Sequence, residues 1–269
     1  PLILWFLNKG QVMKNNYGNL KNDRGFTMIE LMISGVLGVI VLGVAIYVFT
    51  KQQDVSTTQN ASTNIRAKGR HAIKVLAQEL KEIGFGLPPN EGFISPDPVA
   101  DSATISYRAN LFDVRASTPP SAANGGSLND TDIDVVEDGG DFSDNDKIII
   151  YNPSYGDSEL NTVSGTPSST NIPLGSGLEN TYSYGSNSKL VTINKYNDVV
   201  IDLNGTNIRK TVDGGTSTVI VSDVSSLAFS FYGETETSQL STIGITITLE
   251  DPDDSDITQD FSTDITFRN

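Results

Sequence analysis

The chain has 269 residues, no cysteine, one histidine and a net charge of −15 at pH 7. The lack of cysteine excludes a disulfide framework, a thiolate metal site and a cysteine nucleophile. Residues 1–25 carry a charge of +3, so everything from residue 26 onward carries −18. Nucleic-acid phosphates would repel so acidic a body, and we expect no nucleic-acid partner. A single histidine, His71, also argues against a catalytic triad or a zinc site.

The first part of the chain has the composition of a membrane anchor. Residues 1–12 contain no methionine, and we expect translation to start at Met13, with residues 1–12 as an upstream extension. Basic residues, among them Lys21 and Arg24, precede an apolar run, and Leu31 to Thr50 is a stretch of 20 residues without charge. As a helix it would be about 30 Å long, the thickness of the hydrocarbon core of a bilayer. Positive-inside asymmetry predicts a cytoplasmic N-terminus.

The residues around the start of this run form a recognisable motif. No Ala-x-Ala cleavage pattern follows the apolar run, as it would in a secretory signal peptide. An uncleaved anchor is the plain interpretation, but it leaves Gly25, Phe26 and Glu30 unexplained. Arg24-Gly25 followed by Phe26-Thr27-Met28-Ile29-Glu30 resembles the class III signal of type IV pilins and type II secretion pseudopilins. The match includes glycine before the cut, phenylalanine after it, and glutamate at the fifth mature position.

This resemblance implies a particular maturation. A prepilin peptidase would cut between Gly25 and Phe26 on the cytoplasmic side and methylate the new amine of Phe26. The mature protein would keep its apolar helix, which would hold it in the inner (cytoplasmic) membrane by a single pass with the head outside the cytoplasm. Its partners would be other pilins or pseudopilins and the inner-membrane assembly platform, and after assembly it would lie in the pilus fibre.

Two roles for Glu30 stay open. In a packed fibre, its carboxylate can pair with the Phe26 amine of a neighbouring subunit, which offsets the few kcal/mol that an unpaired charge costs near lipid. Alternatively, Glu30 caps its own helix, where a negative charge is favourable by about 0.3–1 kcal/mol. Both roles can hold together. Glu30→Ala should then leave membrane insertion intact but impair incorporation into a filament.

The helical pattern continues beyond the apolar run. One helix is predicted from about Phe26 to Ile83, and Gly84 to Pro89 should end it. Its second half carries one apolar stripe on a polar surface, formed by Ile65, Ile73, Leu76, Leu80 and Ile83. Gly69 is a candidate position for a bend. This half should lie against a globular head.

From about residue 90 the pattern changes to short β-strands between turn-rich segments. Asp213-Gly214-Gly215 predicts a tight hairpin turn. Residues 113–130 and 152–188 are rich in Ser, Asn, Gly, Thr and Pro, and we expect them to be long surface loops or insertions on one head. The predicted strands are Thr104–Arg108, Ile133–Val136, Lys147–Tyr151, Leu190–Asn194, Val199–Leu203, Ile208–Val212, Val219–Val221, Leu227–Tyr232, Ile243–Leu249 and Ile265–Phe267.

The expected fold class is therefore α+β, with a long N-terminal helix packed on a mainly antiparallel β head. The expected division is a leader (1–25), a transmembrane half of the helix (26–50), an amphipathic half (51–84) and the head (85–269). The helix from Arg66, its Gly84-Phe85-Gly86 exit and the closing segments Leu227–Gly233 and Ile243–Leu249 resemble PilW-type minor pilins, and next GspJ-type minor pseudopilins.

Two acidic stretches, residues 137–146 and 251–256, crowd oxygen donors of the kind that calcium prefers. Asp141, Asp144 and Asp146 are the calcium candidates, against the plainer interpretation of a solvated acidic turn. No phosphate-binding glycine loop or GxSxG motif is present. The sequence thus predicts a structural subunit and not an enzyme: a minor pilin of a type IV pilus. The alternatives are a type II secretion minor pseudopilin or an adhesin head displayed on a pilus.

Overall fold

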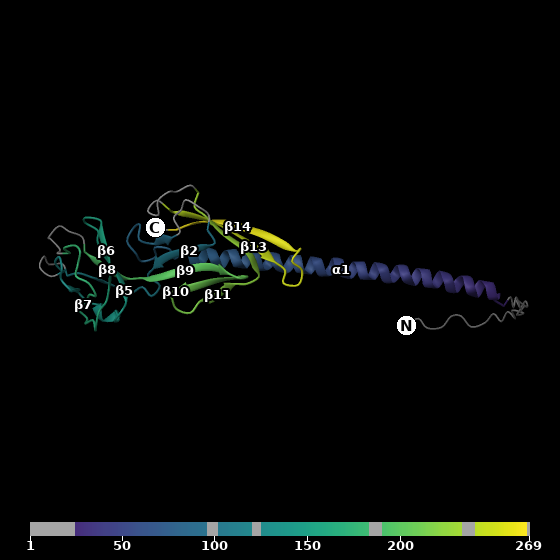
Figure 1. Cartoon of the computed structure of the whole chain (residues 1–269), viewed down its shortest axis with the longest axis horizontal. Coiled ribbons are helices and arrows are strands. Elements are labelled where there is room, and N and C mark those ends of the chain that lie inside the picture. The colour runs from purple at the N-terminus through teal and green to yellow at the C-terminus, as the bar shows by residue number, and fades with distance from the viewer. Residues whose placement is uncertain (1–24, 96–101, 120–124, 183–189, 233–239, 268–269) are drawn as a thin grey trace, which may run out of the picture. The chain divides into compact units, whose positions relative to one another are not determined.

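A long helix and a β-rich body form the described part of the chain (Figure 1). The computed structural model describes residues 25–95, 102–119, 125–182, 190–232 and 240–267. Within these ranges the chain forms one α-helix, α1 (Met28–Leu80), then fourteen β-strands and one short 3-10 helix, η1 (Gly139–Asp141). The expected α+β class is confirmed. The chain divides into two compact units, Pro1–Val55 and Ser56–Asn269.

The first unit contains the N-terminal part of α1. The large apolar side chains of its Leu31–Thr50 run are all exposed, from 46% at Val48 to 71% at Val39. This part of the helix is long and apolar enough to cross a membrane. Because the unit offers these side chains no partner among the described residues, the run needs lipid or another protein to cover it.

In the second unit, the C-terminal part of α1 packs through the predicted stripe. Its buried positions recur at helical spacing and are Ile65, Gly69, Ala72, Leu76 and Leu80. Ile73 is partly buried and His71 is exposed. The helix ends as expected, because Gly84 and Gly86 both adopt a φ of 69°, which favours glycine.

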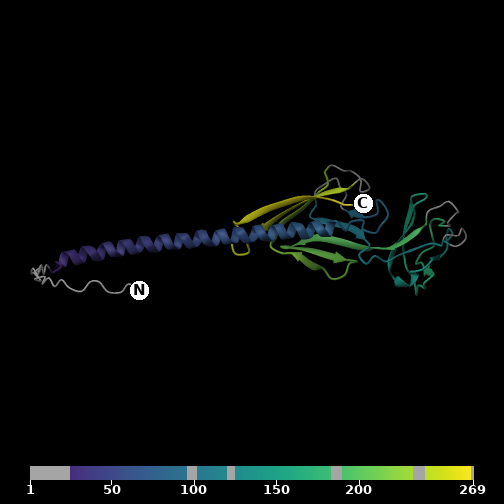
Figure 2. The ribbon, with the colours of Figure 1, turned by 180° about the vertical axis from the view of Figure 1, so that it is seen from behind.

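Two antiparallel sheets share a core with this part of α1. Figure 2 shows them on opposite sides of the helix. A backbone bridge between Ser102 and Phe229 joins them. The first sheet has the order β1 (Phe93–Ser95), β2 (Thr104–Ala109), β9 (Asn197–Asn204), β10 (Asn207–Val212) and β11 (Thr218–Val221); the second has β12 (Val224–Ser230), β13 (Thr242–Glu250) and β14 (Thr258–Thr266).

The remaining strands belong to residues 110–196, which we call the insert; the rest of the second unit, residues 56–109 and 197–267, is the scaffold. The insert lies in sequence between β2 and β9, which pair directly. It contains a four-stranded sheet and a two-stranded sheet. Their orders are β3 (Arg115–Ser117), β8 (Thr192–Lys195), β5 (Lys147–Asn152) and β6 (Asp157–Thr162), and then β4 (Asp132–Asp134) with β7 (Asn171–Pro173).

The insert corrects the prediction of long surface loops. Residues 113–130 contain β3, and residues 152–188 contain β6 and β7, so these segments are not simply loops. The strand β6 escaped prediction because its polarity is reversed: Glu159 and Asn161 are buried, whereas Leu160 is 44% exposed. Hydrogen bonds within the insert partly satisfy the buried Glu159: its Oε2 accepts from the N–H of Glu179 at 3.0 Å, whereas its Oε1 has no hydrogen-bond partner among the described residues.

Most of the other predicted strands are confirmed within one or two residues, whereas β1 of the scaffold was not predicted and β14 is longer than predicted. The strand β14 starts at Thr258, not at Ile265, and pairs with β13 at nine successive positions. Gly69 marks a close contact: a Cβ at this position would overlap the ring of Phe261 on β14. The hairpin turn is confirmed, with Asp213 and Gly214 at φ 49° and 68° and the Gly215 N–H donating to Val212 O at 2.9 Å.

Candidate functional site

The predicted cleavage position lies just before α1 and is open. Gly25, Phe26 and Thr27 precede the helix, which begins at Met28. The Phe26 side chain is 83% exposed. A Cβ built on Gly25 would meet no atom within 4 Å. The Gly25–Phe26 peptide bond therefore has the accessibility that an enzyme cutting the backbone requires, and the helix does not have to unwind to present it.

Thr27 and Glu30 form a reciprocal cap at the start of α1. The backbone N–H of Thr27 donates to Glu30 Oε2 at 3.1 Å, and the Thr27 hydroxyl donates to the same oxygen at 3.2 Å. In return, the Glu30 backbone N–H donates to Thr27 Oγ1 at 3.3 Å. The N–H of Leu31 completes the first turn by donating to Thr27 O at 3.2 Å. This arrangement is a capping box, with Thr27 at the N-cap and Glu30 at N3.

The cap gives Glu30 the local role that the sequence left open. A side-chain cap is worth about 0.5–2 kcal/mol, and the charge near the helix N-terminus adds about 0.3–1 kcal/mol. Sequence reasoning missed Thr27, although the spacing Thr-x-x-Glu before an apolar run is the signature of a capping box. Two of the hydrogen bonds described above involve the Glu30 carboxylate, and both end on its Oε2 atom.

The helix that follows this cap presents small residues among its apolar ones. A Cβ added at Gly35, Gly38 or Gly43 would meet no atom within 4 Å. Small residues on an apolar helix allow another helix to approach closely. The surface from Leu31 to Thr50 can therefore pack in lipid or against helices of other subunits.

The calcium candidates have protein partners of their own. Asp144 Oδ1 accepts the N–H of Gly165 at 2.7 Å. Asp146 pairs with the ammonium of Lys195 at 2.7 Å and also accepts the N–H of Ser143 at 2.8 Å. Asp141 is exposed at the end of η1. Among the residues that the structure describes, no three His, Cys, Asp or Glu side chains gather in a way that could hold a metal ion.

Comparison with known proteins gives one match. Residues 20–46 match the family model described as the prokaryotic N-terminal methylation motif. No curated protein and no solved structure matches the chain. The matched residues contain the open Gly25–Phe26 bond, the Thr27–Glu30 cap and all but the last four residues of the apolar run. The match supports a type IV prepilin-like protein, of the pilin or the pseudopilin kind, with a membrane anchor and pilin-type subunits as neighbours.

Proposed function

We propose that this chain is a minor pilin: a structural, non-catalytic subunit that takes part in type IV pilus assembly or lies at the pilus tip. The observation that carries the proposal is an exposed Gly25–Phe26 bond directly before a capped helix. The apolar run of this helix has no partner among the described residues of its own unit. The proposed parts are the leader (1–25), the transmembrane half of the helix (26–50), the amphipathic half (51–84) and the head (85–269).

Cleavage would change the chemistry at the start of α1. It would create an ammonium group on Phe26, one residue before the cap, and methylation would leave that group cationic. The Glu30 carboxylate of one subunit would pair with the Phe26 amine of its neighbour. Since an unpaired charge near lipid costs a few kcal/mol, this pairing would favour stacked subunits over isolated ones in the membrane. The prepilin peptidase and the inner-membrane assembly platform are the partners that such a pathway needs.

The closing segments of the scaffold favour a PilW-type minor pilin by resemblance, with a GspJ-type pseudopilin next. Purified surface fibres, analysed by peptide mass spectrometry, test the choice. A minor pilin should be present in the fibres at a small fraction of the main subunit, and its deletion should reduce piliation. Loss of protein secretion with normal piliation would instead identify a pseudopilin.

A second candidate function is display of a contact surface on the pilus. The insert favours it, because residues 110–196 have a hydrophobic core separate from the one that surrounds α1. Because the insert adds no buried residue to the core around α1, we infer that it serves a function other than stabilising that core. Deletion of the whole chain that leaves pili intact but abolishes attachment would support this candidate over assembly.

A further inference from the structure

The insert enters and leaves the scaffold at one point. Ala109 at the end of β2 pairs with Asn197 at the start of β9. Paired residues of antiparallel strands lie only about 4.5–5.5 Å apart. Six successive pairs hold β2 and β9 together up to this point. The insert thus occupies the position of a hairpin loop, where a two-residue turn could join the same strands.

The insert also has the core of an independent domain. Thirteen buried apolar residues gather in it, from Ala116 to Ile193, and Ile148, Ile150, Ile172 and Tyr182 are fully buried. None of these residues belongs to the core that surrounds α1. The partners found for the buried Glu159 lie within the insert, since the Tyr182 hydroxyl donates to its Oε2 at 3.0 Å. The thirteen core residues and these Glu159 hydrogen bonds therefore lie within the insert, whereas the buried Asn110, at its first position, donates its N–H to Phe85 O of the scaffold at 2.8 Å.

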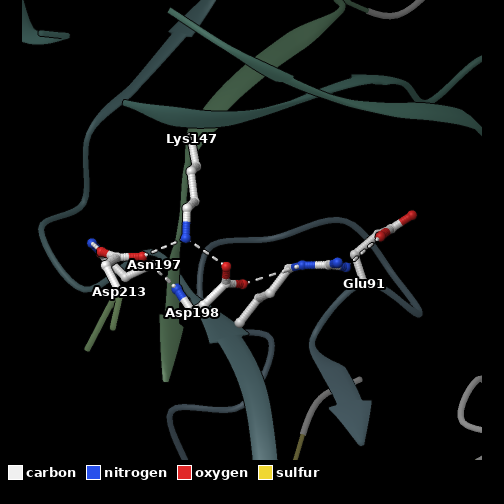
Figure 3. Close-up of polar contacts among 6 residues, drawn as sticks. Glu91, Lys147, Asn197, Asp198 and Asp213 are labelled. Atoms are coloured by element: carbon white, nitrogen blue, oxygen red, sulfur yellow. Dashed lines mark hydrogen bonds and ion pairs between the residues drawn. The ribbon is translucent and has the colours of Figure 1, made fainter. Parts of the chain in front are cut away.

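Polar contacts link the insert to the scaffold, and Figure 3 shows those of Lys147. Lys147 of the insert pairs with Asp198 at 2.6 Å and with Asp213 at 3.0 Å, and Ser158 donates to Glu91 at 2.6 Å. The Lys147 side chain is 34% exposed, as are its partners to a similar extent, so water screens these pairs. Exposed ion pairs contribute about 0–1 kcal/mol each.

The apolar part of this junction is small. Among the described residues, Leu87 of the scaffold clusters with Ile149 and Tyr196 of the insert, and the partly buried Leu111 of the insert packs against the core that surrounds α1. Arg108 lies with its guanidinium 5.4 Å from the centre of the Tyr196 ring. The buried Asn197 Oδ1 at the junction has no hydrogen-bond partner in the described chain, which costs stability, and the buried Arg108 Nε forms no hydrogen bond but lies 3.6 Å from Asp198 Oδ1 in an ion pair. Small polar junctions of this kind couple domains weakly.

We propose that residues 110–196 are a self-contained module grafted onto the tip of the β2–β9 hairpin, and that the scaffold folds, is processed and assembles without it. The module would carry whatever the protein contacts outside the fibre, and the helix and the two scaffold sheets would carry assembly. The folding part of this inference is independent of the proposed function; the assembly part rests on it.

Hydrogen exchange of the full chain in detergent tests the folding part. Ile172→Asp places a charge in the core of the insert, and Ile245→Asp on β13 is the matched change in the scaffold core. With Ile172→Asp, exchange in β5 and β6 should rise by at least about ten-fold while β9, β10 and β13 change by less than about two-fold. If Ile172→Asp instead removes protection from exchange in all of these strands together, the insert is not an independently folding module.

Replacement of residues 110–196 by Asn-Gly in the full chain tests the assembly part. The shortened chain should melt cooperatively, be cut at Gly25–Phe26 and enter fibres within about two-fold of wild type. A second version that also carries Leu87→Ser removes the apolar surface that the deletion uncovers. If both versions are cut but fail to enter fibres, the insert is needed for assembly and the proposal is wrong. If the wild-type chain is itself not cut, the proposed function is wrong, and hydrogen exchange still tests whether the insert folds independently of the scaffold.

Discussion

The two roles of Glu30, helix cap and charge partner, can be separated by two substitutions. Glu30→Gln keeps a side-chain oxygen that can accept from Thr27, because glutamine also serves at N3 of a capping box. It removes the charge. Thr27→Val does the reverse: it removes the hydroxyl that caps the Glu30 N–H and leaves the carboxylate in place. The cap is therefore tested by one variant and the charge by the other.

The expected losses of incorporation for the two variants differ enough to be measured. Loss of the cap costs about 0.5–2 kcal/mol and frays one turn of a helix of 53 residues, so Thr27→Val should stay inserted and incorporate within about three-fold of wild type. Under the proposed pairing, loss of the charge would leave the Phe26 amine of the neighbour unpaired near lipid, at a cost of a few kcal/mol. Since 1.4 kcal/mol is a factor of ten, Glu30→Gln should incorporate at least about ten-fold less.

The assay compares mature chain in sheared fibres with mature chain left in the membrane. Only chains that begin at Phe26 are counted, because Thr27 lies next to the cut and its replacement could slow the peptidase. Wild-type incorporation of Glu30→Gln would refute the pairing of Glu30 with the amine. Equal loss in both variants would show that assembly requires the cap as well as the charge, whereas loss in Thr27→Val alone would show that it requires the cap and not the charge.

The other predictions concern the scaffold and its junction with the insert. Gly69→Ala should destabilise the protein by about 1–2 kcal/mol in thermal or urea unfolding, because its Cβ displaces the Phe261 ring. In a Phe261→Ala background the same change should stabilise the protein by about 0.5–1 kcal/mol, because alanine has the higher helix propensity. If Gly69→Ala destabilises the protein in both backgrounds, the contact with Phe261 is not the cause. At Asp213, burial alone would raise the pKa, but hydrogen bonds from Asn197 and from the Asp198 N–H, together with Lys147, hold the pKa below its ordinary value. A carboxyl group whose pKa is lowered by folding stabilises the folded protein above about pH 4, and this contribution is lost as the pH falls through the folded-state pKa. The melting temperature of Asp213→Asn should therefore fall less than that of wild type between pH 5 and pH 2, because the variant takes up about one proton fewer on unfolding. Equal falls in melting temperature for Asp213→Asn and wild type over this pH range would contradict the pairing of Lys147 with Asp213.

The sequence predicted those parts of the fold that depend on local pattern. Helical spacing predicted α1 and its buried stripe, and strict alternation predicted β13, which the structure places at Thr242–Glu250. The Asp213 turn follows from the tolerance of aspartate and glycine for positive φ. In each of these cases the residues that decide the structure are neighbours along the chain.

The parts that the sequence did not predict depend on distant partners. The strand β6 looks like a loop because Glu159 and Asn161 point inward, and only their hydrogen bonds to residues 176–182 make that possible. Most of β14 is polar because it is an edge strand with one exposed side. The sequence offered only a bend as the role of Gly69, because the Phe261 ring, which leaves no room for a side chain there, lies far along the chain. At the candidate site, Gly25, Phe26 and Glu30 were found by resemblance, and Thr27 was found only from its hydrogen bonds.

Intact-mass and N-terminal peptide analysis of the protein recovered from membranes tests the central claim most directly. The account predicts a mature chain that begins at Phe26, carries a methyl group on its amine and retains the whole apolar helix. A chain whose N-terminus still lies upstream of Phe26, or one that has lost the Leu31–Thr50 run, would contradict it.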